Sequence, residues 1–522
     1  RIRMEQLKKA VRKSVTGRKM SDQFYVDGDV NVPDDKGDVG RIVYSQGMLR
    51  VEDMKQSGSY VRVSGRIQYQ ILYLAGGNDG SISVLQGKLP FEEMVYAEEE
   101  MLGTLWMKES SAELTVTIVH ARKLRLRAMA ELEIISQGEE EQYLTLDVEE
   151  EEGLCRRWKN VEILTLHKSC RESFRIKEEC ALPKQSDPVG KVLFTDITQK
   201  RTEIRLVSDA LQMRGELSIF VLYESTEGKL GWTEQAVPYE GKIDCYGADE
   251  TMYYQAEPKI VDAMADVKLD EDGELRIFGI EAVMEVCAVV YGEEQADVLE
   301  DMYSLKEQVT LEKEEIELSE LVMQKACEYA MAEQIRVPEL DGQVLQICHT
   351  SGKVRIEHTE IVADGIMCEG ILQIGFLYIR ADDAEPFEIW QGMVPFTYVA
   401  ECRSAEAGME YEIQSTCGQP VVSLLGNGEA EIKAVLEFQI FLKRREMVSN
   451  ICEIHTEPLD KKALSEAPGI VGYVMKDGDK LWDLARKYHT TEKRIREVNE
   501  IGEGEPKTGE KILIFKENLG IL

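Results

Sequence analysis

The sequence has few of the residues that a metal centre or a disulfide framework requires. It holds six histidines without an H-E-x-x-H or H-x₃-H pair, and eleven cysteines without a C-x-x-C pair or regular spacing. Zinc sites and disulfide frameworks depend on such spacings. We therefore expect no metal site and no cofactor, and we expect most cysteines to be small core residues in a reducing compartment.

Long apolar runs and an excess of basic charge are also lacking. No apolar run approaches the ~18 residues that span a bilayer, and the first residues do not open the apolar core of a signal peptide. The 97 acidic residues exceed the 62 basic ones, and the resulting charge of −35 repels phosphate backbones and anionic lipids. We expect a cytoplasmic protein that neither binds nucleic acid nor inserts into membranes. The chain begins at Arg1, which leaves room for further residues ahead of it.

No arrangement typical of an active site is present. His120, Cys348 and His349 lie in strand-like segments and form no recognisable pair of nucleophile and base. Residues 502–508 faintly resemble a phosphate-binding loop, but Pro506 stands where that loop needs glycine. We therefore predict that the protein is not an enzyme.

Internal repetition is the most informative feature. Residues 65–73, 215–223 and 370–378 share the template Gly-x-φ-x-φ-x-φ-Leu-Tyr, in which φ is apolar or aromatic. This alternation is typical of a half-buried strand. A proline lies 32 residues before each glycine, and a Pro-aromatic pair lies 23 to 25 residues after it. The landmarks are Pro33, Pro183 and Pro338, and Phe91, Tyr239 and Phe396.

The glycines are separated by 150 and 155 residues, which suits tandem whole domains better than solenoid repeats. We predict a mainly β protein with three homologous, sandwich-like β domains. Their predicted ranges are 20–140, 168–304 and 324–455. We also expect the three template glycines to occupy equivalent strand positions.

Two segments outside these domains show spacings near the helical period. Leu7, Val11 and Val15 recur at steps of four, which predicts a helical segment over residues 1–19. Between the second and third domains a short connecting helix is suggested by Leu318, Leu321, Val322 and Ala326. Residues 456–469 are mostly polar and contain Pro458 and Pro468, which predicts a mobile linker.

The pattern changes over residues 470–516. A short strand, an Asp477-Gly478 turn, two amphipathic helices and a final strand predict a small β-α-α-β domain, with Asp479 as the N-cap of its first helix. The residues fit Y-x-V-x-x-G-D-x-L-x-x-[IL]-A-x-x-Y, then I-x-x-x-N, then G-x-x-[IL]-x-I. This domain resembles LysM, with Met475 and Lys480 as departures from its pattern.

Three repeats of this kind followed by LysM are similar to the SPOCS-domain proteins, and the domain order resembles the SipL-type spore-coat morphogenetic proteins of clostridia. The resemblance implies a sporulation protein of the mother-cell cytoplasm at the surface of the forespore and spore coat. It also implies that LysM docks a coat morphogenetic ATPase and that the protein helps the coat encase the forespore. Contacts with other coat proteins or self-association are further expected roles of the β domains.

The alternative is a cell-wall protein whose LysM binds peptidoglycan or another N-acetylglucosamine polymer. By resemblance, the sugar groove would lie between residues 478–482 and 499–507. Trp482 lies off the apolar stripe of its helix, so it packs within its own module or anchors a partner. The candidate residues for binding a partner or a glycan are Ile470, Gly478, Asp479, Lys480, Leu481, Trp482 and Asn499.

Overall fold

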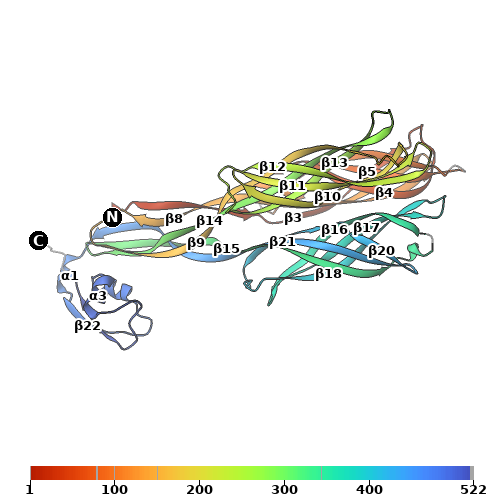
Figure 1. Ribbon diagram of the computed structural model, residues 1–522. Helices are drawn as coiled ribbons and strands as arrows, with labels where there is room; N and C mark the ends of the chain where they lie inside the picture. The colour runs from red at the N-terminus through yellow and green to blue at the C-terminus, as the bar shows by residue number, and fades with distance from the viewer. Residues whose placement is uncertain (1, 78–79, 99, 150, 343, 518–522) are drawn as a thin grey trace.

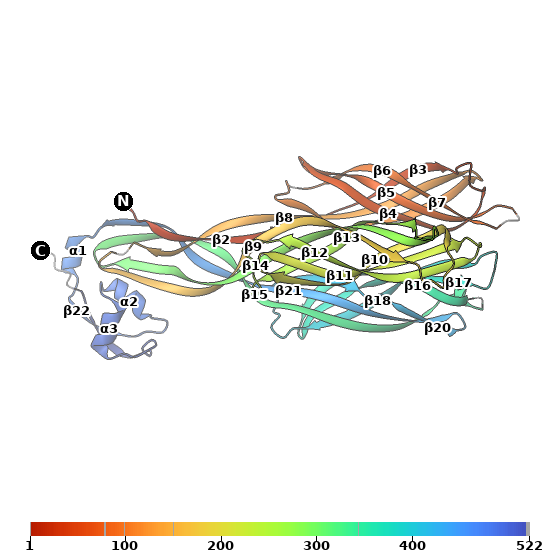
Figure 2. The same ribbon diagram turned by 45° about the horizontal axis from the view of Figure 1, so that its top comes forward.

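The computed structural model describes residues 2–77, 80–98, 100–149, 151–342 and 344–517, and these residues form mainly β-strands, as predicted. Three two-layered units, here called the heads, lie together at one end of the molecule. A stalk of long strands extends from them and carries the C-terminal module at its far end (Figures 1 and 2). The N-terminus also lies at the module's end of the stalk.

Each head contains one sheet of three consecutive antiparallel strands, in the same order in all three heads. The strands are β4 (Val39–Ser57), β5 (Tyr60–Ala75) and β6 (Ile82–Tyr96) in the first head, β10 (Val189–Val207), β11 (Ala210–Ser225) and β12 (Leu230–Asp244) in the second, and β16 (Val344–Val362), β17 (Gly365–Arg380) and β18 (Phe387–Glu401) in the third.

The second layer of each head is built around one long strand, which pairs with strands on both sides. In the first head β8 (Lys123–Val148) lies between β3 (Met20–Asn31) and β7 (Thr104–His120); in the second β14 (Leu275–Ser304) lies between β9 (Leu154–Ala181) and β13 (Tyr253–Leu269). In the third, β21 (Glu429–Pro458) pairs with β15 (Glu307–Arg336) on one side and with β19 (Glu410–Cys417) and β20 (Val421–Gly426) on the other; the short helix η1 (Pro338–Leu340) follows β15.

The landmarks of the sequence repeat meet in space, and the predicted equivalence of the glycines is confirmed. Each glycine is the sixth residue of the middle strand and faces the aromatic residue of a Pro-aromatic pair: Gly65 faces Phe91, Gly215 faces Tyr239 and Gly370 faces Phe396. The aromatic rings cover the space that a glycine leaves in a strand. Each earlier proline begins a turn, with its carbonyl accepting from Lys36, Ser186 or Asp341.

The Leu-Tyr pair that ends each template serves two different cores. Tyr73, Tyr223 and Tyr378 are buried inside their own heads. The preceding leucines point the other way and join one apolar cluster between the heads. That cluster contains Leu72, Ile82, Val84, Leu193, Phe194, Phe220, Leu222, Leu377 and Phe387.

A buried ionic group joins the second and third heads beside this cluster. His349 of β16 places Nε2 2.7 Å from Asp196 Oδ2 and Nδ1 3.7 Å from Glu234 Oε2, and its ring stacks on Phe220 at 4.2 Å between centroids. Burial alone would lower the pKa of His349, but the two carboxylates outweigh it and raise the pKa to about 9. The imidazolium is therefore the stable form of His349 at neutral pH.

We expect this ionic group to make stability depend on pH in the alkaline range. Because the folded-state pKa lies above the ordinary value of 6.5, the contribution is complete below pH 6.5 and is lost as the pH rises through about 9. The expected loss is roughly 3 kcal/mol. Urea unfolding between pH 6 and 9.5 would measure it, and His349→Gln should remove this part of the dependence. Equal pH profiles for the two proteins would contradict the assignment.

The stalk consists of three two-stranded ribbons, one from each repeat. The first pairs β2 (Gln6–Thr16) with residues 137–148 of β8, the second pairs residues 154–166 with 291–304, and the third pairs residues 307–321 with 443–458. The short strand β1 (Ile2–Arg3) adds to β21 at the tip. Inward-facing apolar residues of all three ribbons form the core of the stalk: Val11, Leu144, Val148, Val161, Ile163, Val298, Leu299, Ile316, Leu318, Val448, Ile451 and Ile454.

The predicted helix over residues 1–19 is wrong, because β1 and β2 occupy this segment. A step of four residues is close to one helical turn, but it is also two strand periods, so Leu7, Val11 and Val15 fit both structures. The strand prevails because β8 offers a partner more than a hundred residues away. Local spacing contains no sign of that partner.

The predicted connecting helix is also wrong, because β15 runs unbroken through this region. Leu321 pairs with Lys443 and Met323 with Leu442, so Val322 is an extra, bulged residue. Leu318 lies in the core of the stalk, whereas Leu321 packs with the cluster around Phe441, so the two side chains leave opposite faces of the strand and their spacing of three imitates a helix. The predicted domain limits at 140, 168, 304 and 324 accordingly fall within or at the end of long strands.

The predicted linker is partly ordered. β21 continues to Pro458, and residues 461–466 form the helix α1 (Lys461–Glu466), whose N-cap Asp460 accepts from the amides of Lys462 and Ala463. No side chain of α1 is buried. The segment thus connects the stalk to the module without packing against either through an apolar face.

Candidate functional site

The C-terminal module has the predicted β-α-α-β order. β22 (Ile470–Val474) pairs antiparallel with β23 (Lys511–Phe515), and α2 (Leu481–Lys487) and α3 (Glu492–Asn499) pack on one face of this pair. Thr491 caps α3 through its side chain. The core of the module contains Met475, Leu481, Leu484, Ala485, Ile495, Ile512 and Ile514.

Gly478, Asp479 and Lys480 form the turn that leads into α2. Gly478 has a φ of +82°, which favours glycine. Asp479 accepts from the amide of Lys476 and from the hydroxyl of Tyr473, both at 2.8 Å, and the amide bond in particular lowers the pKa of its carboxyl. The predicted N-cap role of Asp479 is therefore wrong. Lys480 holds the N-cap position and makes no side-chain capping bond.

A glutamate from the opposite loop caps α2 instead. Glu505 Oε2 accepts from the amide of Leu481 at 2.9 Å, so the loop after α3 is tied to the start of α2. Backbone bonds between Met475 and residues 509–510 join the two loops further. By resemblance, a sugar would enter between these loops, and here a carboxylate of the chain itself holds one of the amides.

Two further candidate residues are internal supports. Leu481 is fully buried in the core of the module. The side-chain amide of Asn499 donates to the carbonyls of Ile495 and Leu513 and accepts from the amide of Leu513. Asn499 thereby fastens the end of α3 to β23, and its hydrogen-bonding groups are used within the module.

Trp482 is only 7% exposed, and its contact lies outside the module. Its indole Nε1 donates to Asp301 Oδ2 of β14 at 2.9 Å, and its ring packs edge-on against Tyr303 at 4.9 Å between centroids. Arg157 of β9 lies over the same ring. Trp482 therefore anchors the module to the tip of the stalk.

Four neighbouring bonds add to this attachment, which we call the stalk-tip contact. Arg486 Nη2 donates to Asp301 Oδ1 at 2.5 Å and to the Met302 carbonyl at 2.9 Å. Tyr303 Oη donates to the Thr490 carbonyl at 2.8 Å, and His489 Nε2 lies 2.7 Å from the Leu305 carbonyl. The contact thus joins Asp301, Tyr303 and Leu305 of the stalk to Trp482, Arg486 and His489 of the module. Trp482, Arg486 and His489 follow one another at steps of four and three residues, so they lie on one face of α2 and just beyond its C-terminal end.

Asp301 is the electrostatic centre of the stalk-tip contact. Burial raises the pKa of its carboxyl, but the hydrogen bonds from Arg486 and Trp482 and the nearby Lys313 outweigh burial and lower it. Asp301 is therefore ionised at neutral pH and pairs with a cation from each side. Burial lowers the pKa of His489, which favours its neutral form.

Ile470 lies on a different face of the module. It is 60% exposed, and Val474 and Leu513 on the same side of the strand pair are 50% and 49% exposed. We call these three residues the sheet patch. It is an apolar surface that the described parts of the chain leave open.

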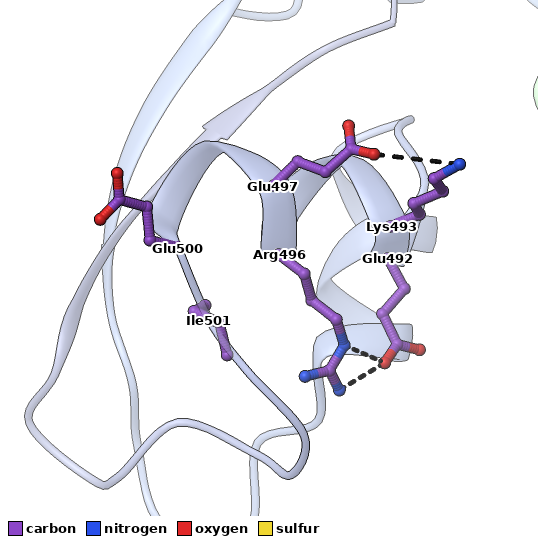
Figure 3. A pocket seen from close by; sticks show the side chains of 6 residues that line it. All are labelled: Glu492, Lys493, Arg496, Glu497, Glu500 and Ile501. Carbon is purple, nitrogen blue, oxygen red and sulfur yellow. Dashed lines mark hydrogen bonds and ion pairs between the residues drawn. The ribbon is translucent and has the colours of Figure 1, made fainter.

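A shallow hollow beside α3 is lined by six residues (Figure 3): Glu492, Lys493, Arg496, Glu497, Glu500 and Ile501. Arg496 bonds to Glu492 at 2.7 and 3.0 Å, and it donates to the carbonyls of Gly502 and Gly504. The guanidinium of Arg496 therefore holds the loop after α3 in place.

Other possible sites are sparse among the described residues. One group, Glu312, Glu453 and His455 at the outer end of the third ribbon, brings three potential metal ligands within 4.8 Å of one another. A cavity of about 250 Å³ lies where heads and stalk meet, beside Trp106, Lys108, Glu257 and Tyr291. No helix in the described part of the chain is long and apolar enough to span a bilayer.

The stalk-tip contact contains residues that the sequence did not indicate. Asp301 and Tyr303 belong to a segment that alternates like any other strand, and they lie 181 and 187 positions from the groups that they bind, Trp482 and Thr490. A buried aspartate is uncommon unless it is paired, but burial is not visible in the sequence. The sequence does show that the loop around Glu505 is acidic, but it does not show that Glu505 bonds to the start of α2.

Comparison with known families identifies two domain types. The family described as SipL, SPOCS domain matches residues 188–268 and 343–419, which cover β10 to β13 and β16 to β19. The LysM domain matches residues 473–515. Neither the comparison with curated proteins nor that with solved structures gave a significant match. Both domain types are non-catalytic families. The chain thus carries two segments of the SipL SPOCS domain and a C-terminal LysM domain, which indicates a sporulation-related LysM protein.

Proposed function

We propose that this protein is a non-enzymatic assembly factor of the spore coat that docks a coat morphogenetic ATPase through its LysM domain. It would act in the mother-cell cytoplasm at the forespore surface and help the coat to encase the forespore. The combination of SipL SPOCS segments with LysM supports this role. Residues 20–140 would form a third SPOCS-like unit, because their sheet has the same strand order as the other two.

The observation that carries the proposal is the sheet patch of LysM. Ile470, Val474 and Leu513 expose apolar surface at the end of the molecule that is remote from the heads. LysM from 470 to 516 is nearly neutral within a very acidic chain, with ten basic and nine acidic residues. Apolar contacts must therefore supply much of the affinity for a partner.

We expect Ile470→Glu to weaken binding of the purified coat ATPase about 30-fold, because a central apolar anchor is typically worth about 2 kcal/mol. Val474→Glu should act in the same direction. The measurement is a titration of the full chain with the ATPase. Val421→Glu is the matched control, because Val421 is equally exposed but lies on the third head. Wild-type affinity in both patch variants would contradict docking through this surface.

The same titration with soluble N-acetylglucosamine oligomers separates this role from cell-wall binding. The bond between Glu505 and the amide of Leu481 uses one of the groups that a sugar acetamide would need. We therefore expect no glycan binding. Tight binding of the oligomers together with no binding of the ATPase would favour the cell-wall alternative.

A further inference from the structure

The face of LysM that carries Trp482, Arg486 and His489 is a binding surface that the stalk of the same chain occupies. Its occupant is the strand end of β14, which offers a carboxylate at Asp301 and an aromatic ring two positions later at Tyr303. The guanidinium and the indole donor both bind the carboxylate. The surface therefore recognises an acidic group followed by an aromatic one in extended backbone.

LysM supplies most of its core itself. Leu481, Ala485, Ile495, Ile512 and Ile514 are almost fully buried in one cluster, to which the stalk adds only Tyr303, Leu305 and the half-buried Cys155. The tether of residues 459–469 does not hold the domain on the stalk either, because α1 buries no side chain. The stalk-tip contact is thus the main attachment between the two parts, and its loss would leave a folded LysM with an exposed Trp482.

We propose that the stalk tip masks this face of LysM, and that a partner segment with an acidic residue and a nearby aromatic ring must displace Asp301 and Tyr303 to bind it. The inference rests on the proposed docking role of LysM and extends the docking surface beyond the sheet patch. The sheet patch is open in the masked state, so a partner can make first contact there. The Trp482 face then becomes available when the stalk tip is released.

The masking has a quantitative consequence. A tethered occupant competes at a high effective concentration, and the apparent affinity for a partner falls in proportion to the fraction of molecules in the open state. Weakening the stalk side alone should therefore strengthen partner binding. This is the opposite of what the loss of a direct partner contact would do.

The test uses stalk-side changes in the full chain, because these leave every LysM side chain in place. Asp301→Ala removes the bonds to Trp482 and Arg486, and Tyr303→Phe removes the bond to the Thr490 carbonyl. We expect Asp301→Ala to tighten binding of the purified coat ATPase at least about tenfold and Tyr303→Phe to tighten it less. Hydrogen exchange of α2 should become faster in the same variants without ATPase.

Asp297→Ala is the matched control, because Asp297 is an exposed acid of the same strand that bonds to Asn160. It should change neither affinity nor exchange. Unchanged or weakened ATPase binding in Asp301→Ala, with wild-type binding still present, would overturn the masking alone. No ATPase binding by any variant would overturn the proposed function and the masking with it. Unchanged exchange of α2 in Asp301→Ala would show that the stalk tip does not hold the domain.

Discussion

Replacing Trp482 by glutamate is expected to detach LysM from the stalk. The change should cost about 4 kcal/mol or more of the free energy that holds LysM against the stalk tip. The indole is 7% exposed, donates to Asp301 and packs on Tyr303, so its removal empties the centre of the stalk-tip contact. The new carboxylate would also lie beside the buried carboxylate of Asp301. Two like charges in one poorly solvated place repel each other strongly.

The measurement is hydrogen exchange of the α2 amides and of the amides near Leu305, together with circular dichroism of the full chain. We expect faster exchange at both ends of the contact and an unchanged strand signal. Trp158→Glu is a suitable control, because Trp158 also lies on the stalk but is 42% exposed. Protection of α2 equal to that of the wild type would show that other contacts hold the domain.

The second large effect is expected at two of the template glycines. A Cβ at Gly65 would lie 2.1 Å from the Arg50 carbonyl oxygen, and a Cβ at Gly370 would lie 2.3 Å from that of Arg355. Both oxygens belong to the backbone of the paired strand, which has a bulge beside each of them. Gly65→Ala and Gly370→Ala should therefore each cost about 3 kcal/mol of unfolding free energy.

The third template glycine should be more tolerant. The pairing of β10 with β11 is irregular between Gln199 and Thr202, next to Gly215. The atom nearest to a Cβ at Gly215 is the hydroxyl of Tyr239, at 2.7 Å. A side-chain end can move more easily than a strand. Gly375→Ala, with Ser351 Oγ at 3.0 Å, should cost less than about 1 kcal/mol. Urea unfolding of the alanine variants at Gly65, Gly370, Gly215 and Gly375 would test this order. Equal losses of unfolding free energy at Gly65 and Gly375 would contradict it.

The strand templates were predictable because they combine a short period with residues of special shape. Gly370 needs an aromatic partner across the sheet, and Phe396 supplies it at a fixed distance along the chain. The LysM pattern was predictable for the same reason, since Gly478 and Ile512 have one conformational or core role each. These features act within a few dozen residues of one another.

The stalk and its contact with LysM depend on pairings between distant segments. Leu318 and Leu321 join two different apolar clusters from opposite faces of β15, so their spacing imitated that of a helix. Glu505, not Asp479, meets the first amide of α2, because the loop after α3 folds back over it. Such pairings arise from tertiary geometry and leave no local pattern.

The three ribbons of the stalk also constrain how the protein can change in length. In an open solenoid a unit can be added or removed, since each unit meets only its two neighbours. Here the ribbons surround a common interior, so the arrangement is a closed ring of three. Loss of one unit would leave two apolar rows facing water, and a fourth would have no gap to enter. Deleting a single repeat should therefore abolish the fold of the stalk, and not merely remove one surface from an otherwise intact protein.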